Sequence, residues 1–232
     1  MIRTSLLKIG YILAVSSSLL FVNAAQANIL TIDSFTQSQK VTDRGDTVSA
    51  SQNSQTAISG SDIENISRLL IAEARFGNIA HKTTVETKAG ALTISNSSDS
   101  AVLAGVKWSF QPINFKNYGD TLALEVKDTD LNLVGIEVII NDLYSSGIKN
   151  FIGSGSFEVG FSEFLQPNLF NSVSSLRLNF TGPASWDGQF GPLTVINRST
   201  PEIGSVPLPP AYLLMASSLF GLVSISRSKS PD

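Results

Sequence analysis

Short runs of apolar or alternating residues, separated by clusters of turn-forming residues, recur throughout the middle of the chain. Nine such runs have the length of β-strands: 29–32, 83–87, 91–95, 102–110, 121–126, 134–140, 155–161, 175–180 and 193–196. The separators are rich in Gly, Asn, Asp, Ser and Pro, which favour turns because of their backbone freedom or their local hydrogen bonds. Many short strands with regular turn signals predict an all-β domain over residues 28–205, an antiparallel β-sandwich or jelly roll.

Two segments depart from this alternation. Residues 36–61 are polar and nearly without large apolar side chains, which predicts a long loop. Just beyond it, Ser61 and Glu64 have the spacing of a helix capping box. Apolar residues then recur at helical spacing, at Ile63, Ile66, Leu70 and Ala74. On this pattern alone, residues 62–74 would form a helix.

The N-terminus has the three parts of a secretory signal peptide. Arg3 and Lys8 supply positive charge, and residues 9–22 form an apolar stretch too short for a good stable anchor. Ala25 and Ala27 then provide the small side chains that signal peptidase requires. We therefore predict a signal peptide over residues 1–27, cleaved after Ala27, and export of the rest of the chain. The alternative is an uncleaved membrane anchor.

The C-terminus carries a second apolar stretch between a proline-rich motif and basic residues. The motif is Val206, Pro207, Leu208 and Pro209, and its prolines end any preceding structure. Residues 211–226 predict a transmembrane helix, and Arg227 and Lys229 lie in a basic tail over residues 227–232. Positive charge after the span predicts that the tail faces the cytoplasm and the domain lies outside it.

This tail over residues 206–232 resembles the PEP-CTERM family of sorting signals, in the variant whose motif reads Val-Pro-Leu-Pro. The resemblance implies recognition by an exosortase-like membrane peptidase that processes the protein near the proline motif. It also implies an inner-membrane intermediate, followed by location at the cell surface or outside the cell. Family members occur in bacteria that make extracellular polysaccharide, so exopolysaccharide is the expected partner. The alternative is a plain single-span tail anchor, retained rather than cleaved.

The rest of the chain resembles exported members of the same family in three places. An Ile-Asp-x-Phe start is present at residues 32–35, and residues 70–75 lie where those proteins have a turn that contains an arginine, here Arg75. Trp108 stands where they have a tryptophan-containing strand. The resemblance implies a strand over residues 68–71, against the helix that the local pattern suggests. It also implies a domain that looks like the carbohydrate-binding jelly rolls.

Composition and charge narrow the function classes. The 232-residue chain has no cysteine, which excludes disulfides, thiolate zinc sites and cysteine nucleophiles. Residues 28–205 contain 12 basic and 18 acidic side chains, a net charge of −6. An acidic domain without basic runs is a poor ligand for nucleic acid. We therefore expect no nucleic-acid partner.

Candidate catalytic and metal-binding groups are sparse. His81 is the one histidine, and it has no second histidine or cysteine with which to form a typical zinc site. Nothing in the sequence pairs the carboxylates near predicted strands as a glycosidase would require, and these are Glu125, Glu137, Glu158 and Glu163. Residues 128–132 offer alternating oxygen ligands that fit either Ca²⁺ or a hairpin turn. We predict no catalytic residue and no cofactor, with Ca²⁺ as the one metal to consider.

The two tryptophans are the candidates for stacking on a sugar ring. Trp108 lies in an alternating strand and is predicted to face the core. Trp186 lies in a loop rich in Gly and Pro beside Asp187, which predicts an exposed aromatic ring with a carboxylate to bind hydroxyl groups.

Together these features predict an exported, non-catalytic surface or extracellular-matrix protein that binds exopolysaccharide. Two alternatives remain at this stage: a hydrolase that acts on polysaccharide, and a structural or adhesive subunit of the envelope. Two carboxylates with raised pKa values across a cleft would favour the first. A large exposed apolar patch would favour the second.

Overall fold

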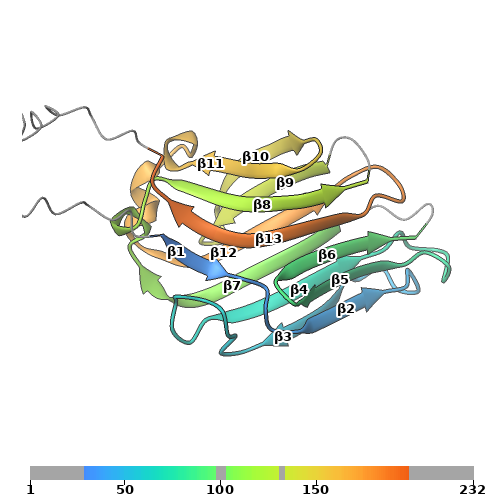
Figure 1. The fold of residues 1–232 in the computed structure, drawn as a ribbon. Coiled ribbons are helices and arrows are strands. Elements are labelled where there is room, and N and C mark those ends of the chain that lie inside the picture. Colours follow the sequence, from blue (N-terminus) through green and yellow to red (C-terminus); the bar gives the residue numbers. More distant parts are fainter. Residues whose placement is uncertain (1–28, 98–102, 131–133, 199–232) are drawn as a thin grey trace, which may run out of the picture.

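The computed structural model describes residues 29–97, 103–130 and 134–198. This part contains thirteen strands, three short 3₁₀ helices and no α-helix, which confirms the predicted all-β antiparallel fold (Figure 1). None of its helices is long and apolar enough to cross a membrane. The predicted signal peptide with Ala25 and Ala27, the sorting motif, and the span 211–226 lie outside the described residues.

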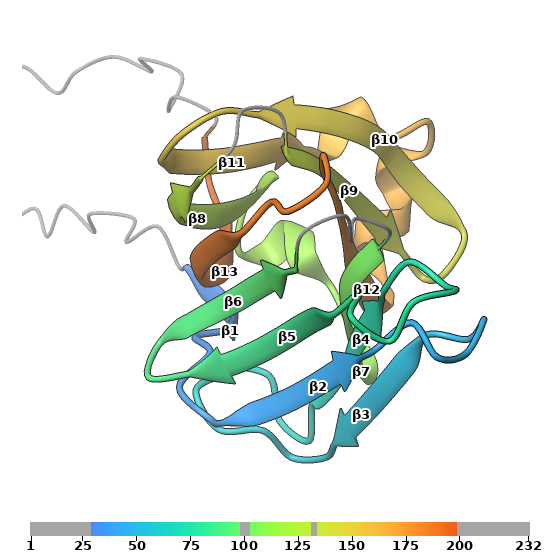
Figure 2. The ribbon, with the colours of Figure 1, turned by 90° about the vertical axis from the view of Figure 1, so that its right-hand side faces the viewer.

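The strands form two sheets that lie face to face (Figure 2). The seven-stranded sheet contains, in spatial order, β11 (Gly155–Gly160), β8 (Thr121–Thr129), β13 (Gly188–Ile196), β6 (Ala91–Asn96), β5 (Thr83–Lys88) and β2 (Gln39–Asp43), with β1 (Leu30–Asp33) also paired to β13. The six-stranded sheet contains β10 (Tyr144–Phe151), β9 (Val134–Ile140), β12 (Val173–Thr181), β7 (Leu103–Ile113), β4 (Ser67–Glu73) and β3 (Ser51–Gln55). The 3₁₀ helices are η1 (Phe115–Asn117), η2 (Phe161–Glu163) and η3 (Pro167–Asn171).

The strand pairing identifies the last eight strands as a jelly roll. These strands pair as in a long hairpin folded at the turn between β9 and β10: β9 pairs with β10, β8 with β11, β7 with β12 and β6 with β13. Successive nested pairs alternate between the two sheets, which is the arrangement of a double-sheet jelly roll. Four of the first five strands widen this unit: β5 and β2 extend one sheet beyond β6, and β4 and β3 extend the other beyond β7, while β1 pairs with β13.

The predicted loop over residues 36–61 is wrong, because it contains the edge strands β2 and β3. Both strands are mostly polar, and the sequence gives no apolar signal for either beyond Val41. Their stability comes from pairing with β5 and β4 and from side-chain bonds between them. Gln39 Nε2 donates to the Asn53 carbonyl at 2.7 Å, and Asn53 Nδ2 donates to the Lys40 carbonyl at 2.7 Å.

The helix suggested by the pattern over residues 62–74 does not form. Residues 67–73 are strand β4, which confirms the strand over 68–71. The apparent capping box is instead a tight turn, in which Ser61 Oγ accepts a hydrogen bond from the Ile63 N–H at 3.0 Å. Ile63, Ile66 and Leu70 are nevertheless buried, so the pattern reported core residues correctly but not their backbone conformation.

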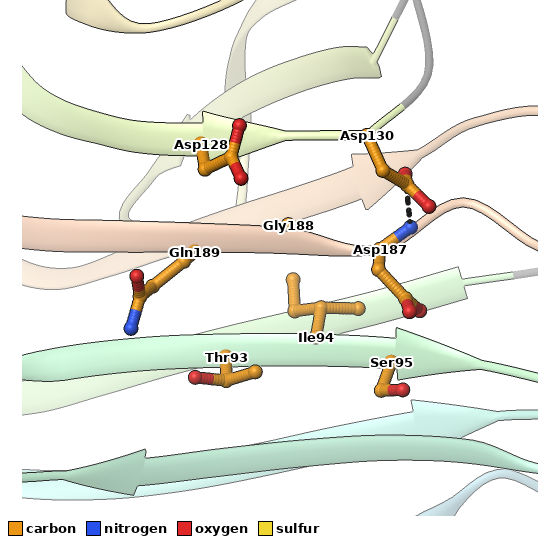
Figure 3. A pocket seen from close by; sticks show the side chains of 8 residues that line it. All are labelled: Thr93, Ile94, Ser95, Asp128, Asp130, Asp187, Gly188 and Gln189. Atoms are coloured by element: carbon orange, nitrogen blue, oxygen red, sulfur yellow. Dashed lines mark hydrogen bonds between the residues drawn. The ribbon is translucent and has the colours of Figure 1, made fainter.

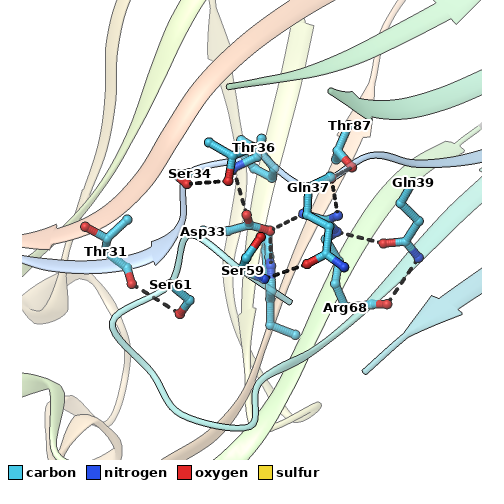
Figure 4. A network of polar contacts seen from close by, with 12 residues as sticks. Thr31, Asp33, Ser34, Thr36, Gln37, Gln39, Ser59, Ser61, Arg68 and Thr87 are labelled. Carbon is cyan, nitrogen blue, oxygen red and sulfur yellow. Dashed lines mark hydrogen bonds and ion pairs between the residues drawn. The ribbon is translucent and has the colours of Figure 1, made fainter. Parts of the chain in front are cut away.

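A buried polar network ties four strands together at the widened end of the sandwich (Figure 4). Asp33 and Arg68 form an ion pair at 2.8 Å, and both side chains are fully buried. Trp108 Nε1 donates to the same Asp33 oxygen at 2.8 Å, and Arg68 Nε donates to Gln39 Oε1 at 2.7 Å. Asp33 and Trp108, noted separately in the sequence, are therefore in direct contact. The arginine that joins them is Arg68, not Arg75.

Candidate functional site

A shallow pocket of about 160 Å³ lies on the outer face of the seven-stranded sheet, where β6, β13 and β8 are adjacent (Figure 3). Its lining residues come from these three strands and the loops at their ends: Thr93, Ile94, Ser95, Asp128, Asp130, Asp187, Gly188 and Gln189. Apart from Ile94 and Gly188, every lining residue has a polar side chain.

Strand register explains why these side chains gather. Gln189 is the pairing partner of both Thr93 and Asp128, so the three side chains form one row across three strands. Phe190, which follows Gln189, is fully buried, so Gln189 points away from the core. Between this row and the next lie Gly188 and Ile94, which both face the core. Ile94 is buried, and a Cβ at Gly188 would lie 3.0 Å from the buried Phe190 ring, so the sheet backbone is the floor of the pocket.

A second polar row closes the other side of the pocket, from Ser95 through Asp187 to Asp130. Asp187 Oδ1 accepts a hydrogen bond from the Asn96 N–H at 2.7 Å. Asp130 Oδ1 accepts one from the Asp187 N–H at 2.7 Å. Each of these two carboxylates is held by a backbone donor through one oxygen, and among the described residues no hydrogen bond to its other oxygen is present.

Trp186 is not the exposed ring that the sequence predicts. Its side chain is 2% exposed, because the loop turns it inward beneath the pocket. A Cβ atom at Gly182 would lie 2.6 Å from the ring, and one at Gly188 would lie 3.1 Å from it. The two glycines therefore make room for the indole. Trp186 supports the pocket from below, whereas Asp187 lines it, and Trp108 is buried in the core as predicted.

Ca²⁺ binding by residues 128–132 remains a prediction. Within the residues that the structure describes, no three acidic, histidine or cysteine side chains are placed to share one ion. Asp128 and Asp130 flank the pocket at separate positions along the end of β8, while residues 131 and 132 lie outside the described part.

The other candidate carboxylates lie outside the pocket. Glu137 is on the six-stranded sheet and accepts a hydrogen bond from Asn179 Nδ2 at 2.9 Å. A hydrogen bond from Arg198 lowers the pKa of Glu158, although burial partly opposes the shift. A hydrogen bond from Lys149 lowers the pKa of Glu163 in the same way. A glycosidase acid needs a raised pKa, so neither group fits that role.

Glu125 is on β8, packed over Gly191 on β13. His81 lies in a loop, where its Nδ1 is 2.8 Å from the Arg75 carbonyl oxygen. No described catalytic partner accompanies either residue. The structure therefore brings together Asp128, Asp130 and Asp187, with Thr93, Ser95 and Gln189 as members that the sequence did not single out.

Fold and pocket define a class: a jelly-roll protein with a polar, acidic hollow on one sheet face. No protein-family model matches the chain, and no curated protein matches it significantly. A family 11 carbohydrate-binding module from Clostridium thermocellum, in complex with a β-1,3-1,4-mixed-linked tetrasaccharide, is similar with a TM-score of 0.38 and 11% identity. The family 11 module of the cellulosomal cellulase Lic26A-Cel5E of Clostridium thermocellum is similar with a TM-score of 0.37 and 11% identity. Each match covers 73% of this chain and 95% of the module. At these values the similarity is one of overall shape and assigns no ligand.

Proposed function

We propose that this protein is an exported, non-catalytic surface or extracellular-matrix protein that binds polysaccharide in the pocket between β6, β13 and β8. The observation that carries the proposal is the lining of the pocket: three carboxylates, two hydroxyls and one amide, from three adjacent strands. Sugars present many hydroxyl groups, and ionised carboxylates are strong acceptors for such donors.

The negative charge of the pocket limits which polysaccharides it can bind. Among the residues that the structure describes, no lysine, arginine or histidine lines the pocket. A ligand that carries carboxylate or phosphate groups would meet three like charges there without compensation. The lining therefore favours neutral polysaccharide over uronate-rich or phosphorylated polymers.

Delivery to the cell exterior follows from the two terminal segments, the signal peptide over 1–27 and the sorting segment over 206–232. We assign the second to an exosortase-like peptidase that acts at Val206 to Pro209, with a membrane-spanning intermediate. The last described residues, Asn197 and Arg198, follow β13 at the end of the strand farthest from the pocket.

The test is binding of the purified full-length chain to an array of neutral and acidic bacterial polysaccharides. We expect retention on neutral polymers and weak or absent retention on uronate-rich ones. Gln189→Ala should reduce affinity about two- to tenfold, the effect of one lost hydrogen bond. Gln52→Ala, an exposed glutamine on the other sheet, is the matched control and should have no effect.

Three results would count against the proposal. The first is no binding to any polymer, and the second is binding that the pocket and control variants affect equally. The third is release of new reducing ends from a bound polymer, which would replace the binding function by hydrolysis.

A further inference from the structure

The polar row through the pocket continues across β5 and β2 to the edge of the sheet. Thr93 is also the pairing partner of Glu86, and Glu86 is the partner of Lys40. One row of outward side chains therefore crosses five neighbouring strands, in the order Lys40, Glu86, Thr93, Gln189 and Asp128.

A second row runs parallel to the first. Thr42 is paired with Thr84, and Thr84 with Ser95. Asp187 precedes Gly188, the partner of Ile94, and so lies beside Ser95. Asp130 completes the row through the hydrogen bond between its carboxylate and the Asp187 N–H. This row crosses β2, β5 and β6 and ends on the residues next to β13 and β8, in the order Thr42, Thr84, Ser95, Asp187 and Asp130.

The two rows, together with the strip of sheet backbone between them, form a surface that runs across the strands and is called the trough below. The residues between the rows point into the core, as Val41, Val85 and Ile94 show, so the sheet backbone forms the floor. Neighbouring strands lie about 4.8 Å apart, which makes the trough about 19 Å long from β2 to β8. The rows are two residues apart along each strand, which separates them by about 7 Å. The pocket described above occupies one end of this surface, over β6, β13 and β8.

The two rows offer half-buried or exposed acceptors, such as Glu86 and Gln189, and no unpaired cation, whereas Thr84 is buried beside Thr42. Lys40 is paired with Glu86 at 3.0 Å, and the hydroxyls of Thr42 and Thr84 are 3.1 Å apart. The lining of both rows contains no aromatic side chain, so binding depends on hydrogen bonds. Each such bond contributes little net free energy, because it replaces one to water. A ligand must therefore use many of them at once.

From this geometry we infer that the binding site is the entire trough, and that its ligand is a neutral, extended glycan chain lying perpendicular to the strands. This inference rests on the proposed function and specifies its ligand. Successive sugars contact successive strands, with one end of the chain seated in the pocket and the other end over β5 and β2. Affinity then grows with chain length until the trough is filled.

The experiment measures affinity of the full-length protein for a size series of oligosaccharides, from disaccharide to octasaccharide, prepared from neutral glucans, mannans and galactans. A double variant, Thr42→Val with Glu86→Ala, removes acceptors at the far end of the trough without touching the pocket. Ser54→Ala, exposed on the six-stranded sheet, is the control.

We expect affinity to rise with length and then level off. The far-end variant should lower affinity for the longest oligosaccharides about threefold to tenfold, and leave affinity for the disaccharide unchanged. Affinity that does not increase with length, or a far-end variant equal to the control on long chains, would overturn the trough while leaving pocket binding intact. No binding to any neutral oligosaccharide or polymer would overturn both proposals.

Discussion

Replacement of Arg68 by methionine is the most severe test of how the fold is held together. The substitution keeps an unbranched apolar chain of similar length but removes the guanidinium from Asp33. The Asp33 side chain is fully buried, so its charge would lose its ion-pair partner without gaining water. Removal of one member of a buried ion pair costs about 3–5 kcal/mol, against a total stability of about 5–15 kcal/mol for a natural domain.

The other hydrogen bonds of the network set the expected size of this loss of stability. Arg68 also donates to Gln39 Oε1 at 2.7 Å and to the Gln37 carbonyl at 2.8 Å, so the variant removes two further hydrogen bonds, although the Gln37 carbonyl keeps the one from Thr87 Oγ1. Asp33 retains its bonds from Trp108 and from the Phe35 N–H. These two donors keep the carboxylate in place, so we expect a loss of stability in the lower half of the range of about 3–5 kcal/mol.

Urea unfolding of the wild type, Arg68→Met, Asp33→Asn and the double variant forms a double-mutant cycle. We expect each single variant to be strongly destabilised and the double variant to lose much less than their sum, because it buries no lone charge. Lys40→Ala breaks an exposed ion pair and should cost less than about 1 kcal/mol. A loss below that value for Arg68→Met, or strict additivity in the cycle, would refute the reasoning.

Three other variants test separate features of the molecule. Gly119→Ala should destabilise the domain, because its Cβ would lie 2.1 Å from a backbone oxygen at the end of β13; Gly160→Ala, with no side-chain or backbone atom closer than 3.5 Å, is the thermal-unfolding control. Glu158→Gln should lower the unfolding midpoint at neutral pH but not in acid. The hydrogen bond from Arg198 lowers the pKa of Glu158 in the folded state from the ordinary value of 4.5. The stabilisation from this carboxylate is therefore present above pH 4.5 and is lost as the pH falls through the folded-state pKa. A midpoint difference that persists in acid would contradict that assignment. Changing Pro207 and Pro209 to Ala should leave full-length protein in the inner membrane by fractionation, and unaltered release would argue against exosortase-type sorting.

Sequence patterns correctly predicted the strands that have one apolar and one polar face. Alternation placed the strand around Trp108 and its inward side chain correctly, because side chains in a strand alternate between faces. The same signal failed for β2 and β3, which stand at sheet edges and have few apolar positions. Alternation also failed to predict β10. Gly147 lies within this strand at a positive φ of 70°, where the pairing register with β9 shifts. In the sequence, a glycine at such a bulge resembles a turn between two strands.

The candidate site was harder to predict, because it depends on contacts between distant residues. The sequence marked Asp187 as a candidate because it is a polar residue on a loop. Its carboxylate is held by the N–H of Asn96, 91 residues away in the chain. Thr93 and Gln189 resemble any outward residue of a strand. Only the order of β6, β13 and β8 in the sheet makes them neighbours, and that order is not encoded in any local pattern.

The position of the chain ends determines how the site would be presented. Leu30 on β1 is the partner of Val195 on β13, so the described domain begins and ends at the same place (Figure 1). The pocket lies at the other end of β13, about 26 Å away at 3.3 Å per residue. A domain held at its C-terminal end would therefore present the pocket away from the attachment. A pull between a bound glycan and that end would act along β13, at right angles to its hydrogen bonds with β8 and β1. The bonds of the ladder would then share the load together rather than opening one after another.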